Sequence, residues 1–140
     1  GKSVQMMVAR IKEAIDKFGP LPEVAPLAAE LGKRLEQLGK LTMELGAAAM
    51  KNREEVGAAA ADYLAVAGYV CLGWCWLAAA GVASKKLAAG DAEADFYRAK
   101  LVTAKHYFDR SLPRIAAHAA AARAGAAGLM ELPAEHFAFA

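Results

Sequence analysis

The 140-residue sequence has no excess of charge of either sign, because 17 Lys and Arg residues stand against 15 Asp and Glu residues and the formal net charge is +2. Proteins that grip nucleic acid through its phosphates need a clearly basic surface, so this balance argues against a nucleic-acid partner. Charged residues make up only 23% and hydrophobic residues 57%. That composition excludes an intrinsically disordered chain, and we expect one folded domain.

Cysteine is scarce, since only Cys71 and Cys75 occur, four residues apart in an apolar run. Side chains at this spacing share a helix face but are poorly oriented for a disulfide, so we expect buried free thiols in a reducing compartment. The opening residues Gly1, Lys2 and Ser3 contain neither a methionine nor the apolar run of a signal peptide. We therefore expect a cytoplasmic chain that is a piece of a longer one.

Patterns that accompany enzymatic chemistry are missing as well. None of the residues three positions before His106, His118 and His136 is acidic, which excludes the Glu-x-x-His pairs of di-iron bundles. The sequence has no glycine-rich phosphate loop, no serine or cysteine beside a plausible base, and no histidine near Cys71 and Cys75 that would complete a metal site. We expect no catalytic, cofactor-binding or metal-binding residues here, and no activity from this chain alone.

What the sequence does contain is alanine, at 36 of 140 positions, and alanine is a strong helix former and a poor strand residue. Apolar residues at steps of three and four predict helices over about residues 3–18, 23–50, 53–87 and 91–124. No stretch alternates with a period of two. We therefore predict an all-α protein, an antiparallel four-helix bundle with up-down-up-down topology.

Local signals refine this prediction at several positions. Pro113 should kink the fourth helix, and the remaining residues should form a short tail whose apolar side chains cover one end of the bundle. Asn52 with Glu55 three residues later predicts a capping box before the third helix, and Asp91 predicts the N-cap of the fourth. On the second helix, the predicted core stripe runs through Thr42.

The third predicted helix carries 21 consecutive uncharged residues at positions 63–83. That length could cross a bilayer, and two lysines follow it. However, many of these residues are alanine or glycine, and the neighbouring helices are amphipathic, which a lone spanning helix would not require. A helix that is apolar all round is also typical of a bundle centre. We favour a buried central helix and no membrane partner over a membrane span.

One series of short motifs resembles a known family. The resemblance begins with Tyr63-Leu64, followed by Gly68-Tyr69-Val70 and Gly73-Trp74-Cys75-Trp76-Leu77. It continues through Phe96-Tyr97, Lys100-Leu101, His106-Tyr107-Phe108, Leu112-Pro113, Gly128-Leu129-Met130 and Leu132-Pro133. In order and spacing these motifs resemble the C-terminal domain of the enlarged bacterial acyl-CoA dehydrogenases, which include the 3-methylmercaptopropionyl-CoA dehydrogenases. The likeness covers about residues 56–137 and is only generic over residues 1–55.

The resemblance implies a flavoenzyme of fatty acid metabolism whose earlier domains hold FAD and the acyl-CoA thioester. In that family the base is a glutamate in a Tyr-Glu-Gly-Thr segment, which this sequence lacks, so no catalytic residue is transferred. The parent reaction would remove the α-proton to the base and the β-hydride to the flavin. The partners implied are the dehydrogenase domains of the parent chain, and this segment itself would bind no cofactor.

A domain that is docked on a larger enzyme should expose apolar side chains where its partner lies. Adjustable methionines and large aromatic residues suit such an interface, and this surface could also join two copies about a two-fold axis. The alternatives are an independent helical protein-interaction module and, less favoured, a small membrane protein. The candidate interface residues are Met6, Met7, Trp74, Trp76, Leu132, Phe137 and Phe139.

Overall fold

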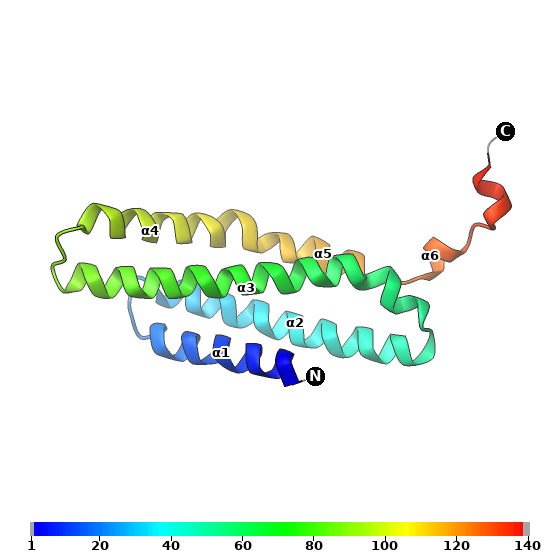
Figure 1. The fold of residues 1–140 in the computed structure, drawn as a ribbon, viewed down its shortest axis with the longest axis horizontal. Coiled ribbons are helices and arrows are strands. Elements are labelled where there is room, and N and C mark those ends of the chain that lie inside the picture. The colour runs from blue at the N-terminus through cyan, green and yellow to red at the C-terminus, as the bar shows by residue number, and fades with distance from the viewer. Residues whose placement is uncertain (1, 139–140) are drawn as a thin grey trace.

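The computed structural model describes residues 2–138, and every regular element in that range is helical, without a strand. The prediction of an all-α protein is therefore confirmed. The helices are α1 (Lys2–Phe18), α2 (Ala25–Lys51), α3 (Glu54–Ala88), α4 (Ala94–His106), α5 (Ile115–Ala122) and α6 (Ala127–Met130), followed by a final 3-10 turn (Ala134–Phe137). Figure 1 shows α1 and α3 running in one direction and α2 and α4–α5 in the other.

The long helix α3 organises the molecule, because α1, α2, α4 and α5 all pack against it. Its inward positions Val66, Val70 and Leu77 are fully buried, and they meet Leu31 of α2 and Leu112 of the α4–α5 segment in a single core cluster. The finer prediction of an antiparallel four-helix bundle with up-down-up-down topology stays a prediction. A groove separates the start of α2 from α4.

The contact between α1 and α3 depends on a glycine. The Phe18 ring lies against Gly81 so closely that a Cβ atom added there would overlap the ring. The ammonium groups of Lys17 and Lys85 lie 5.2 and 5.3 Å from the centroid of the same ring, a favourable arrangement for cations and an aromatic face. Gly81 thus allows the end of α1 to approach α3.

The fourth predicted helix is interrupted where the sequence places Pro113. A π-helical turn (Tyr107–Ser111) and a 3-10 turn (Leu112–Arg114) separate α4 from α5. Proline has no N–H to donate, and its ring clashes with the preceding turn, so the backbone locally changes its hydrogen-bonding pattern. Through this change Tyr107, Phe108 and Ile115 all remain buried.

Three local predictions are wrong in whole or in part. On α2, Leu41 is fully buried and Thr42 is exposed, so the core stripe passes one residue earlier. Asn52 has an extended backbone (φ −146°, ψ 115°), and its side-chain oxygen accepts a hydrogen bond from Glu54 N at 3.1 Å, as the side chain of an N-cap residue does. The other half of the predicted capping box is wrong, because the Glu55 carboxylate accepts from Ala126 N instead. Asp91 accepts a hydrogen bond from the Glu93 amide, but α4 begins only at Ala94, with Glu93 as its cap residue. Asp91 therefore orders the turn before α4 and does not cap that helix.

The C-terminal tail does not cover an end of the bundle, contrary to our expectation. Figure 1 shows it leaving the body beyond α5. Leu129, Met130 and Phe137 are more than 60% exposed, and Leu132 is 45% exposed. Gly125 has φ +80°, in the region that favours glycine, and it ends the helical segment before the tail.

Candidate docking surface

One face of α3 is apolar and open to solvent. Leu64, Leu72 and Val82 on this face are 71%, 52% and 49% exposed. The face runs for about 32 Å, at 1.5 Å per residue. Its residues follow one another at steps of three or four, the spacing of a single helix face. We call it the open face; it consists of Ala61, Leu64, Gly68, Leu72, Cys75, Ala79 and Val82.

The open face is uncovered because the neighbouring helices contact α3 at other positions. On the α1 side, the Cys71 thiol donates to Met7 Sδ at 3.3 Å. On the α4 side, the Tyr107 hydroxyl donates to the Tyr69 carbonyl at 2.7 Å. Between these contacts, Leu31 of α2 packs beside Gly73. The neighbouring helices therefore surround only part of the circumference of α3.

The prediction of a central helix buried on all sides is wrong for this face. Helix α3 is long and apolar enough to cross a membrane by length and composition, yet only 33% of its most apolar 18-residue window is buried in the fold. The amphipathic helices bury one part of α3, half-buried residues such as Trp74 and Trp76 pack at its edge, and the open face holds the most exposed residues of the uncharged run. A surface of this size without a charged group is typical of a contact with another apolar surface.

The two cysteines lie in different surroundings, and the prediction that both are buried is wrong for Cys75. Cys71 is half-buried beside α1, and its pKa is raised first by burial and further by the neighbouring Cys75 thiol. Cys75 is exposed and belongs to the open face. A thiol at this position reports directly on whether the face is covered.

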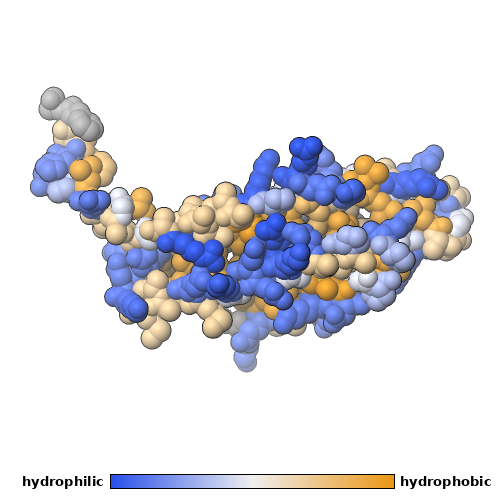
Figure 2. Space-filling view, turned by 180° about the vertical axis from the view of Figure 1, so that it is seen from behind, coloured by the Kyte–Doolittle hydropathy of each residue, from blue (hydrophilic) through white to orange (hydrophobic). Residues whose placement is uncertain are grey.

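The interface residues chosen from the sequence are distributed over several surfaces. Met6 is 65% exposed on α1, whereas Met7, Trp74 and Trp76 are half-buried and pack against the core. Leu132 and Phe137 lie on the tail, which stands clear of the body in Figure 2. Phe139 lies outside the described residues.

Sequence reasoning missed Leu64, Leu72 and Val82. The signal was present, because these three positions fall on one face of the uncharged run. The prediction from sequence places that whole run in the interior, because the sequence alone does not tell how many helices surround another.

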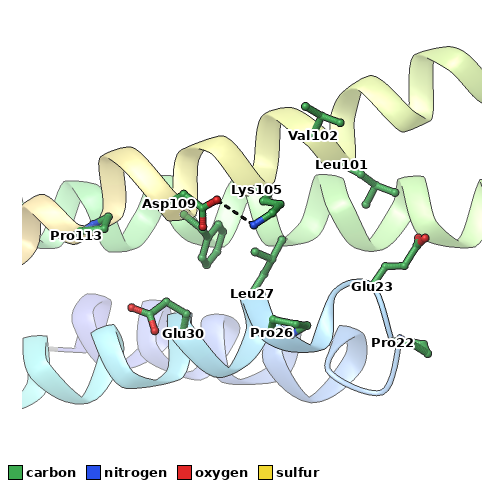
Figure 3. Close-up of a pocket in the computed structure, with 11 residues that line it drawn as sticks. Pro22, Glu23, Pro26, Leu27, Glu30, Leu101, Val102, Lys105, Asp109 and Pro113 are labelled. Carbon is green, nitrogen blue, oxygen red and sulfur yellow. Dashed lines mark hydrogen bonds and ion pairs between the residues drawn. The ribbon is translucent and has the colours of Figure 1, made fainter.

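A groove of about 750 Å³ separates the first turns of α2 from α4. In Figure 3, Leu27 from α2 and Leu101 and Lys105 from α4 point into the space between the two helices. The charged groups at its rim are mostly paired, since Lys105 Nζ lies 2.9 Å from Asp109 and Arg34 bonds Glu30 at 2.9 Å. The groove is thus an apolar cleft with an acidic rim.

This groove does not fit FAD. The pyrophosphate of a dinucleotide needs backbone N–H groups of a glycine-rich loop or cationic side chains. The lining instead presents three carboxylates and one lysine that is already paired. We therefore derive no flavin chemistry from this chain.

A carboxylate and an imidazole meet between α3 and α5. His118 Nδ1 lies 2.8 Å from Asp62 Oδ1, and the His118 ring lies 5.8 Å from the Tyr69 ring, centroid to centroid. Asp62 and His118 are both about one-third exposed. No group of three His, Cys, Asp or Glu side chains in residues 2–138 is placed to hold a metal ion. The pair connects two helices at the surface.

The structure therefore defines an all-helical domain with an exposed apolar face along its longest helix. A family model described as "Acetyl-CoA dehydrogenase C-terminal like" matches residues 5–133. The chain belongs to this family. The match includes most of the first 55 residues, where the resemblance from sequence motifs was only generic. No curated protein matches the chain.

Proposed function

We propose that this chain is a non-catalytic C-terminal domain of an acyl-CoA dehydrogenase-like flavoenzyme, docked on the dehydrogenase domains of its parent chain through the open face of α3. The observation that carries this proposal is an uncharged face about 32 Å long in a domain whose family is the acetyl-CoA dehydrogenase C-terminal type. Large apolar side chains such as Leu64 and Leu72, 71% and 52% exposed, favour burial against a partner.

In this proposal the parent reaction is the FAD-dependent α,β-dehydrogenation of an acyl-CoA, and the chain supplies none of the reacting groups. The lack of a phosphate-binding loop and of the Tyr-Glu-Gly-Thr segment supports this division of labour. The domain supports the enzyme's structure, lines a substrate channel or joins subunits. We place the parent with the cytoplasmic, oligomeric 3-methylmercaptopropionyl-CoA dehydrogenase group, on the motifs from Tyr63 to Pro133, and we treat the antiparallel helices as one up-down-up-down four-helix bundle.

Two other functions use the same surface differently. A stand-alone interaction module would cover the open face with an unrelated protein, and a membrane protein would cover it with lipid. The family match over residues 5–133 favours the dehydrogenase domains. The membrane alternative predicts that the chain is recovered only with detergent, whereas our proposal predicts recovery without it.

The experiment compares the effect of one charge substitution on stability in the 140-residue chain and in the protein made from the complete gene. Leu72→Asp should leave the free energy of unfolding of the 140-residue chain within about 0.5 kcal/mol, because Leu72 is already 52% exposed. In the protein made from the complete gene, the same change should lower the melting temperature, because it buries a carboxylate at the docked face. Val102→Asp is the matched control, since Val102 is 70% exposed on α4.

The proposal is contradicted if Leu72→Asp and Val102→Asp are equally harmless in the complete protein. It is also contradicted if the 140-residue chain alone binds flavin or reduces a dye with any acyl-CoA. The first result would place the docking surface elsewhere on the molecule. The second would place reacting groups within this chain.

A further inference from the structure

A second groove lies between α2 and α3, next to the N-terminal end of α1. It encloses about 540 Å³, and its lining is mainly apolar: Leu45, Val56, Ala59, Ala60, Tyr63 and Leu64. Its polar atoms are largely satisfied, because the Thr42 and Tyr63 hydroxyls hydrogen-bond each other at 2.9 Å. Val56 and Leu64 are 60% and 71% exposed at its rim. We call it the α2–α3 groove.

The rest of the α2–α3 surface is filled by α1, which shows what kind of segment fits there. Met7 contacts Cys71 and Phe18 contacts Gly81, so α1 runs parallel to α3. Figure 1 shows that α1 begins well short of the end where α2 and α3 meet. The α2–α3 groove is the part of the surface that α1 leaves uncovered, and it favours a short apolar segment.

The C-terminal tail is a segment of that kind without a partner. Residues 127–138, which we call the arm, contain α6 and the final 3-10 turn. Leu129, Met130, Leu132 and Phe137 of the arm are 45–65% exposed. Four large apolar side chains in such a short segment favour burial, and the arm is separated from the body in Figures 1 and 2.

The root of the arm is fixed at the edge of the same groove. Glu55, which lines the groove, accepts a hydrogen bond from Ala126 N at 3.2 Å, and Ala126 is 2% exposed. The amides of Leu129 and Met130 both bond the Ala126 carbonyl at 3.0 Å. The first turn of the arm therefore continues directly from a buried, anchored residue, and this turn directs the arm away from its own body.

We propose that the arm lies in the α2–α3 groove of a second copy of the chain. Each copy offers one arm and one groove, so a two-fold exchange covers both arms and both grooves and closes the assembly. The partner is a second copy because the anchored root directs the arm outward, while the arm and the groove share the same apolar character. This inference does not depend on the proposed docking of the open face, which shares only Leu64 with the lining of the α2–α3 groove.

The test uses disulfide formation between two different variants of the 140-residue chain. Cys71 and Cys75 are first replaced by alanine, and a single cysteine is then placed at Leu132 of the arm in one variant and at Ala60 of the groove in another. Leu132 and Ala60 are exposed, so neither change disturbs the core. Val102→Cys on α4, at a position 70% exposed, replaces Ala60→Cys as the control.

When the two variants are mixed and oxidised, the L132C–A60C product should form at least about tenfold faster than the L132C–V102C product, because docking raises the effective concentration of the two thiols. Peptide mass spectrometry identifies the linked residues. Equal rates would overturn the proposal. It is also overturned if a chain carrying both L132C and A60C forms its disulfide within one monomer, because the arm would then occupy its own groove.

Discussion

Replacing Gly81 with alanine tests how α1 is held against α3. A Cβ atom at Gly81 would meet the body of the Phe18 ring, with three ring carbons as its nearest neighbours. Phe18 is 6% exposed and ends α1. The ring must therefore leave its position, together with its contacts to Lys17 and Lys85.

Two effects of opposite sign set the change in the free energy of unfolding that Gly81→Ala causes. Alanine favours a helix interior over glycine by about 1 kcal/mol, whereas inserting an atom into a packed contact costs about 1–3 kcal/mol. Gly39 on α2 supplies the matched control, because a Cβ added there meets no atom within 4 Å. Gly39→Ala should therefore gain the propensity term alone, and Gly81→Ala should be about 1–3 kcal/mol less stable than that control.

Urea denaturation of the 140-residue chain, followed by far-ultraviolet circular dichroism, measures both free energies of unfolding. We expect a midpoint above the wild type for Gly39→Ala and at or below it for Gly81→Ala. Equal stabilisation by both substitutions would refute the packing of Phe18 on Gly81 described above.

Three further predictions concern the core. Tyr107→Phe should cost about 0.5–1.5 kcal/mol at neutral pH, because the hydroxyl that bonds Tyr69 is lost. Burial raises the pKa of Tyr107 from its ordinary 10.0 to about 12. Because the folded state holds this proton more tightly than the unfolded state, the stabilisation that comes from this shift is complete below pH 10 and is lost as the pH rises toward 12. The wild type should thus lose about 1 kcal/mol more than Tyr107→Phe between pH 9 and pH 11 in urea titrations, and parallel losses would contradict the shift. Leu31→Ala should cost about 2–5 kcal/mol in the same assay, because Leu31 is fully buried, whereas Leu129→Ala at a 65% exposed site should change stability by less than about 0.5 kcal/mol.

The parts of the fold that periodicity and proline chemistry control could be predicted from the sequence. Apolar steps of three and four placed α1, α2 and α3 to within two residues of their ends. Pro113 marked the interruption between α4 and α5, because the missing N–H is a local property of one residue.

The surroundings of α3 could not be predicted in the same way. The apolar run at 63–83 is compatible with burial on all sides or on some, and only the packing of α1, α2 and α4 decides which face stays open. The prediction for the C-terminal tail was wrong for a related reason. Leu132 and Phe137 are apolar, which favours burial, but Glu55, 71 residues earlier in the chain, anchors Ala126 where the tail begins, and the tail leads outward from there. Such long-range contacts leave no local pattern.

The thiol of Cys75 provides the most direct test of the proposed docking of the open face. In the 140-residue chain Cys75 is exposed, whereas Cys71 is half-buried with a raised pKa, so a maleimide at neutral pH should label Cys75 first. The same labelling is then carried out on the protein made from the complete gene, and mass spectrometry reads the peptide that contains Cys75. Strong protection of Cys75 in the complete protein is the result we predict. Equal labelling of Cys75 in both proteins would contradict the docking of α3 on dehydrogenase domains.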